Sequence, residues 1–168
     1  MITIRKELFE DIDAIRQINE EAFGQSLEAD IVDALRVDCV EFLSFVAEVD
    51  GKVVGYILFT PVLIETDGEG IEGAGLAPMA VLPEYQRQGV GSMLVEEGLR
   101  FLQETGCPFV VVLGHAHYYP RFGFEPASRY DIRSEWAVPD DSFMIMIFDE
   151  SQFSGISGVA RYRPEFSE

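Results

Sequence analysis

The chain has 168 residues, of which 48% are hydrophobic and 25% are charged. This length fits one domain with one core, and the apolar fraction excludes a wholly disordered chain. No apolar run reaches the ~18 residues that a membrane-spanning helix needs, and the N-terminus lacks the basic-then-apolar layout of a secretory signal. We therefore expect a cytoplasmic protein that does not insert into a membrane.

The formal net charge is −18, from 30 acidic and 12 basic residues. This balance argues against nucleic-acid binding, because a phosphate backbone requires a basic surface. An acidic surface can attract cationic substrates, but solubility or tolerance of high salt explains it equally well. The acidic residues are spread from Glu7 to Glu168 rather than clustered, which favours the second explanation.

The first half of the chain predicts a short strand, two helices and three antiparallel strands. Alternating residues mark a strand near residues 2–5, and apolar residues at helical spacing mark helices near 12–22 and 26–35. The pair Asp50-Gly51 is a tight-hairpin signal. The three strands are expected at about residues 42–49, 52–64 and 75–82.

The second half predicts a strand–loop–helix–strand unit with a right-handed crossover. A polar loop at 83–91 leads into a helix at 90–105, and Phe109–Leu113 reads as a strand buried on both faces, beside a parallel neighbour. A further strand is expected at 143–148, and Trp136 is expected in the core. The sequence therefore predicts one α+β domain over residues 1–168, with a mixed, mostly antiparallel sheet flanked by helices.

The loop before the second-half helix predicts an anion site. The predicted strand ends, a turn follows that contains glycines with the spacing Gln86-x-x-Gly89-x-Gly91, and a helix then begins. The first amides of a helix have no intrahelical partner and lie at the positive end of its dipole, so they bind anions such as a pyrophosphate. The spacing is neither that of a P-loop nor that of the dinucleotide fingerprint.

That spacing resembles the acyl-CoA-binding signature of the GNAT superfamily of N-acetyltransferases, Gln/Arg-x-x-Gly-x-Gly/Ala. A second block, Tyr118 to Phe124, is similar to the Tyr-x-x-x-Gly-Phe element of that family, and the order of elements fits its fold up to about Phe148. The stretch from Gly75 to Ala127 is similar to the YhbS-like group of predicted acetyltransferases. The resemblance implies an acyl-CoA-binding core at about residues 75–127.

The resemblance also implies which residues bind acetyl-CoA, the acyl donor of the family. A strand with free backbone groups would hold the pantetheine arm, and its backbone N–H near Ala80 or Val81 would polarise the thioester carbonyl. The loop and the first helical turn would hold the pyrophosphate. The implied set is Met79, Ala80, Val81, Gln86, Arg87, Gln88, Gly89, Val90, Gly91 and Ser92.

Tyr119, four residues before Gly123, matches the general acid of the family and would donate a proton to the departing thiolate. Three features depart from the family pattern, one of them being that no acidic residue stands on the predicted strand at 75–82 to act as a base. Pro120 pushes Tyr119 away from helical angles, and Val112 stands where many relatives carry an asparagine. No residue stands out as the base, and the candidates are Glu72, Glu84, His115 and His117.

The implied function is transfer of an acetyl group from acetyl-CoA to a primary amine, by direct attack of the neutral amine. The alternative is an acyl-CoA-binding sensor or scaffold that does not catalyse transfer. The acceptor, a small molecule or a protein amine, is not indicated, although the tail after Asp149 is a candidate to line its pocket. No metal is expected, since the two histidines stand without nearby cysteines or an acid cluster. A homodimer is expected on family grounds alone.

Overall fold

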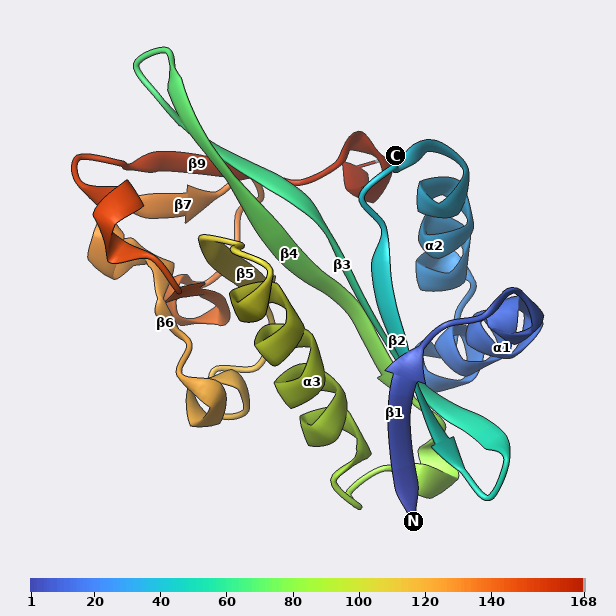
Figure 1. The fold of residues 1–168 in the computed structure, drawn as a ribbon. Coiled ribbons are helices and arrows are strands. Elements are labelled where there is room, and N and C mark those ends of the chain that lie inside the picture. Colours follow the sequence, from blue (N-terminus) through green and yellow to red (C-terminus); the bar gives the residue numbers. More distant parts are fainter. Residues whose placement is uncertain (168) are drawn as a thin grey trace. The chain divides into compact units, whose positions relative to one another are not determined.

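The computed structural model describes residues 1–167 and folds them around a mixed, mostly antiparallel sheet (Figure 1). The strand order is β1–β2–β3–β4–β5–β8–β6, and β9 pairs with β3 and β7. The strands are β1 (Ile2–Lys6), β2 (Leu43–Val49), β3 (Lys52–Thr66), β4 (Glu69–Val81), β5 (Phe109–Leu113), β6 (Glu125–Pro126), β7 (Ile132–Ser134), β8 (Phe143–Ile147) and β9 (Gly158–Arg161). The α-helices are α1 (Ile12–Phe23), α2 (Leu27–Asp38) and α3 (Val90–Glu104).

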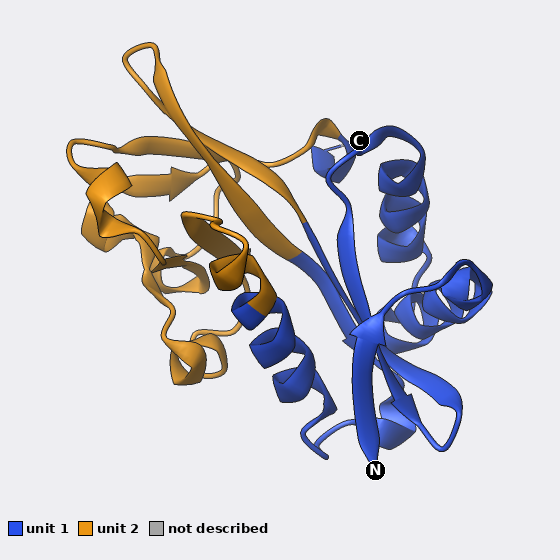
Figure 2. Ribbon diagram, in the orientation of Figure 1, with its two compact units in different colours: residues 1–59, 77–100, 165–168 blue, residues 60–76, 101–164 orange. Residues whose placement is uncertain are grey.

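The chain forms two compact units (Figure 2). Unit 1 contains Met1–Phe59, Ala77–Arg100 and the chain from Glu165 on, and unit 2 contains Thr60–Leu76 and Phe101–Pro164. Strands β3 and β4 and helix α3 each run from one unit into the other. None of the helices among residues 1–167 has the length and apolar character needed to span a membrane.

Unit 1 has helices on both faces of its strands (Figure 1). Strand β2 pairs antiparallel with both β1 and β3. The predicted hairpin is confirmed, with positive φ at Asp50 and Gly51 as a tight β-turn of the primed type requires. A Cβ at Gly55 of β3 would lie 2.9 Å from Val90 and 3.1 Å from Leu94, so this glycine allows α3 to approach the sheet.

Unit 2 contains the parallel part of the predicted βαβ unit. Ala74–Leu76 of β4 pair in parallel with Val110–Val112 of β5, and β5 pairs antiparallel with β8. Strand β4 begins at Glu69, earlier than the expected residue 75, because the hairpin turn is limited to Asp67 and Gly68, which both have positive φ. The segment from Ser151 on has no clear hydrophobic period in its sequence, yet it contains β9, which pairs with Leu63–Glu65 of β3.

Candidate functional site

The loop that precedes α3 lies in unit 1, and hydrogen bonds from its own side chains to its backbone hold it together. It contains a 3-10 turn at Pro83–Tyr85, and the Leu82 amide donates to the Val54 carbonyl at 2.9 Å. The Gln86 side-chain amide donates back to the Val81 carbonyl at 2.9 Å, and that of Gln88 donates to the Glu84 carbonyl at 3.1 Å. These bonds hold the loop in one shape without using the backbone amides that follow Gln88.

The backbone after Gln86 turns through two left-handed residues, Arg87 with φ +63° and Gly89 with φ +86°. A non-glycine residue in this region costs about 1 kcal/mol or more, which indicates that the surrounding loop imposes the conformation. A Cβ at Gly89 would meet nothing within 4 Å. Glycine is therefore required there by the backbone angle, and the space beside it is open to a ligand.

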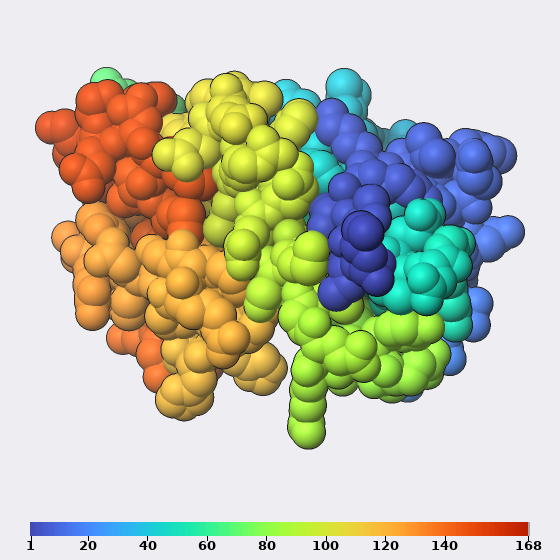
Figure 3. Space-filling model, turned by 60° about the horizontal axis from the view of Figure 1, so that its bottom comes forward, coloured from blue at the N-terminus to red at the C-terminus, as the bar shows by residue number. Residues whose placement is uncertain are grey.

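Helix α3 follows directly, and its first hydrogen bond runs from the Met93 amide to the Gly89 carbonyl at 3.1 Å. Residues 86–89 are exposed, and the yellow-green segment ahead of α3 carries a narrow projection into solvent (Figure 3). Amides at the start of a helix bind anions together with the helix dipole. The loop and the first turn of α3 thus fit a pyrophosphate by charge and by access.

The predicted pantetheine strand is the last part of β4. Its pairing with β5 stops at Leu76, although β4 continues to Val81. Met79 is half-buried, whereas Ala80 and Val81 are buried. Backbone N–H and C=O groups beyond Leu76 are therefore not used in the ladder to β5, which is the arrangement that a bound amide-containing arm requires.

Tyr119 lies in unit 2 at the start of a 3-10 turn, Tyr119–Phe122. The turn accommodates Pro120 near its N-terminal end, where the missing amide is tolerated. The Tyr119 ring is packed so closely on Gly114, just after β5, that a Cβ there would lie 2.4 Å from it. Tyr118 and Phe124 contact the ring edge-on, at centroid distances of 5.0 and 5.7 Å.

Burial governs the chemistry of Tyr119, whose side chain is only 7% exposed. Desolvation, with a smaller contribution from Tyr118, raises the pKa of Tyr119 to about 12. An ordinary tyrosine has a pKa near 10. The hydroxyl group of Tyr119 is therefore protonated throughout the physiological pH range, and its proton is available to a hydrogen-bond acceptor.

The four candidate bases are all exposed: Glu72, Glu84, His115 and His117. Glu84 of unit 1 has an ammonium neighbour, Lys52 Nζ, at 3.8 Å. Val112 is fully buried, so the position of the family asparagine holds no polar group. Among these candidates the structure singles out no base.

The sequence did not predict the pairing of two aromatic residues of unit 2, Trp136 and Tyr162. Trp136 was expected in the core, but it is half-buried and lies in the segment between β7 and β8. Its ring packs against that of Tyr162 at 5.1 Å, and Tyr162 follows β9. The segments around both residues have no periodic hydrophobic pattern. The presence of a single tryptophan in a polar stretch was the one feature of the sequence that drew attention to this region.

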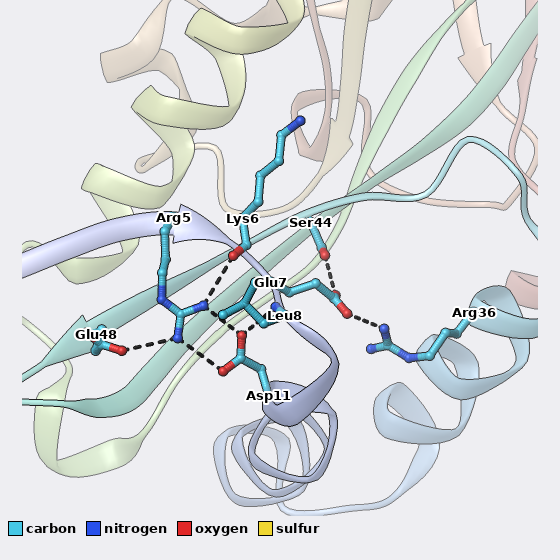
Figure 4. Close-up of polar contacts among 8 residues, drawn as sticks. All are labelled: Arg5, Lys6, Glu7, Leu8, Asp11, Arg36, Ser44 and Glu48. Carbon is cyan, nitrogen blue, oxygen red and sulfur yellow. Dashed lines mark hydrogen bonds and ion pairs between the residues drawn. The ribbon is translucent and has the colours of Figure 1, made fainter.

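A polar network in unit 1 holds β1 to the helices and to β2 (Figure 4). Arg5 donates to both oxygens of Asp11, at 2.7 and 3.1 Å, and to Glu48 at 3.1 Å. Glu7 accepts hydrogen bonds from Arg36 of α2 and from Ser44 of β2. The hydrogen bonds from Arg5 lower the pKa of Asp11, so this buried carboxylate is charged and structural.

The comparisons with known proteins identify the family. The acetyltransferase (GNAT) domain model matches residues 41–126. The uncharacterized N-acetyltransferase YhbS of Escherichia coli K12 is 36% identical over 98% of both chains, and YjhQ of the same strain is 46% identical over 70% of this chain and 66% of its own. The chain belongs to the GNAT family of N-acetyltransferases.

Two solved GNAT structures match nearly the whole chain. E. coli YhbS in complex with CoA superposes with a TM-score of 0.90 at 36% identity, covering 99% of this chain and 92% of that one. A GNAT acetyltransferase from Brucella melitensis in complex with acetyl-CoA superposes with a TM-score of 0.80 at 37% sequence identity. The match covers 99% of this chain and 98% of that one. The predicted GNAT fold, with its mixed, mostly antiparallel sheet, is confirmed.

Proposed function

We propose that this GNAT chain binds acetyl-CoA and transfers the acetyl group to a primary amine by direct attack. The observation that carries the proposal is the exposed loop with left-handed Arg87 and Gly89 at the start of α3. The relatives bound to CoA and acetyl-CoA support the choice of donor. Bound acetyl-CoA supplies an acyl group activated as a thioester.

Two stretches of unit 1 would hold the donor. The backbone amides of the loop and of the first turn of α3 face a pyrophosphate, and the Arg87 guanidinium adds positive charge. The end of β4 would hold the pantetheine arm, with the N–H of Ala80 or Val81 polarising the acyl carbonyl. The proposed residues are Met79, Ala80, Val81, Gln86, Arg87, Gln88, Gly89, Val90, Gly91 and Ser92.

Tyr119 of unit 2 is the proposed general acid. Its raised pKa keeps the phenol protonated, so its O–H is available to the thiolate sulfur as the carbon–sulfur bond breaks. The close packing on Gly114 and Phe124 restricts the ring to one orientation. A proton donor held in this way costs little reorganisation during the reaction.

We further propose that residues 1–168 act as one catalytic domain in the cytoplasm. The support for one domain is that β3, β4 and α3 each have residues in both units. Neither unit therefore contains these three elements in full. A homodimer, expected on family grounds, remains a prediction.

Two measurements test the proposal. Calorimetric titration with acetyl-CoA, CoA and ATP should show saturable binding of the two CoA compounds and none of ATP. A thiol assay across a panel of primary amines should then show amine-dependent release of CoA. Binding without release would favour the non-catalytic acyl-CoA-binding module, and absence of binding would contradict both functions.

A further inference from the structure

A cavity of about 210 Å³ lies within unit 2, beside the segment that joins β7 to β8. Its lining includes the buried side chains of Ile132 and Phe143, together with half-buried Trp136 and Val138. Exposed Arg133 and Asp140 also line it. The cavity therefore combines buried apolar side chains with an exposed polar part.

The cavity is connected to Tyr119 through two sets of contacts. On one side, Trp136 packs on Tyr162, whose pKa is raised by burial first and then by the nearby Glu135 and Tyr119. On the other side, Phe143 of β8 pairs with Leu113 at the end of β5. The next residue, Gly114, packs against the Tyr119 ring. The proposed acid and the cavity are thus held by neighbouring parts of the same unit.

The lining contrasts with the rest of the protein in charge. The whole chain has a net charge of −18, but the charged side chains of the cavity are one arginine and one aspartate, which cancel. A polycation gains nothing from such a lining, whereas an apolar group gains contact with Trp136, Val138 and Phe143. An apolar cavity of about 150 Å³ accommodates benzene, so this one has room for a phenyl group and a short linker.

We propose that this cavity binds the apolar substituent of the acceptor amine, so that the substrate is an alkylamine or arylalkylamine rather than a polyamine. The inference rests on the proposed transfer reaction, because it assigns the acceptor of that reaction. The apolar substituent would lie against Trp136, which lines the cavity. The acidity of the surface then has no part in selecting the substrate.

Trp136 is the single tryptophan of the chain and reports on the cavity directly. Titration of the full-length protein with 2-phenylethylamine, followed by tryptophan fluorescence, should give a saturable change, whereas spermidine should give none at the same ionic strength. A response to spermidine with no response to 2-phenylethylamine would overturn the proposal. This measurement needs no turnover, so it is independent of the transfer reaction.

Steady-state kinetics with substituted proteins provide the second test. Trp136→Ala should raise KM for 2-phenylethylamine by about tenfold, as expected for loss of an aromatic contact, and leave KM for acetyl-CoA unchanged. Trp136→Phe should restore most of the affinity. The matched control is Asp140→Asn, which keeps the shape of the cavity and should change KM less than about twofold.

The outcomes separate the two proposals. A fluorescence change without CoA release would uphold binding of the apolar amine in the cavity, but it would contradict the transferase and, with it, the assignment of that amine as the acceptor. CoA release whose KM for 2-phenylethylamine is unaffected by Trp136→Ala would uphold the transferase and overturn the cavity. An increase in KM with Asp140→Asn as large as that with Trp136→Ala would show that the cavity selects a cation, and would also overturn the proposal.

Discussion

At the scale of single residues, the environment of Tyr119 leads to a prediction about catalysis. Tyr119→Phe keeps the ring that packs on Gly114 but removes the proton, so kcat should fall by about 10²-fold, the usual size of a general-acid effect. KM for acetyl-CoA should stay constant. Tyr118→Phe, which removes a hydroxyl group from the adjacent ring, is the matched control and should keep most of the activity. Full turnover by Tyr119→Phe would rule out the proposed role.

Asp11 leads to a prediction about acid stability. Because Arg5 lowers the pKa of Asp11 below the unfolded value, the carboxylate stabilises the fold at pH values above the unfolded pKa, near 3.9. That stabilisation is lost as the pH falls through the folded pKa. Asp11→Asn should therefore cost about 1–3 kcal/mol in urea unfolding at pH 7 and weaken the acid dependence. Exposed Asp141→Asn is the control, and an equal loss there would contradict the assignment.

At the scale of elements, the loop before α3 depends on the left-handed backbone of Gly89. Gly89→Ala introduces strain of about 1 kcal/mol and places a methyl group where the donor phosphates are proposed to approach, so the Kd for acetyl-CoA should rise by about tenfold or more. Gly68→Ala, at another left-handed glycine with open space beside it, is the matched control. It should lose similar stability and bind acetyl-CoA normally in the same calorimetric titration.

The packing of α3 on β3 leads to a second prediction for an element. In a helix, alanine is favoured over glycine by about 1 kcal/mol. A Cβ at Gly98, however, would lie 2.3 Å from the Phe59 ring, and overpacking costs about 1–3 kcal/mol. The clash should outweigh the gain, so Gly98→Ala should lower Tm. A higher Tm in a thermal melt would show that the helix can shift away from the strand.

At the scale of the whole molecule, a net charge of −18 implies electrostatic repulsion that salt should screen. If salt screening reduced this repulsion in the folded state by about 1 kcal/mol, Tm would rise by about 2–4 °C in a chain of this size. Thermal melts from low salt to 0.5 M NaCl should show this rise, with sucrose at equal osmolality as the control for a general solute effect. A Tm that does not change with NaCl would contradict both the repulsion and an adaptation to high salt.

Features set by neighbouring residues could be predicted from the sequence by itself. Asp50-Gly51 specified a hairpin, and the glycine spacing from Gln86 to Gly91 specified the turn into α3, because backbone angles and helix starts depend on adjacent residues. The apolar run Phe109–Leu113 likewise revealed the parallel partner of β4, although only Phe109–Val112 are buried and Leu113 is exposed, because it ends the strand. Together with the family motifs, these local signals were enough to predict the GNAT fold.

Features that depend on residues far apart in the chain were decided only by the tertiary structure. The burial of Tyr119, and hence its pKa, results from Gly114 and Phe124 closing around the ring. The pairing of β9 with β3 brings Tyr162 against Trp136 and so forms part of the surroundings of the cavity. Burial and cavity shape are sums over such distant contacts, and no local pattern in a sequence encodes them.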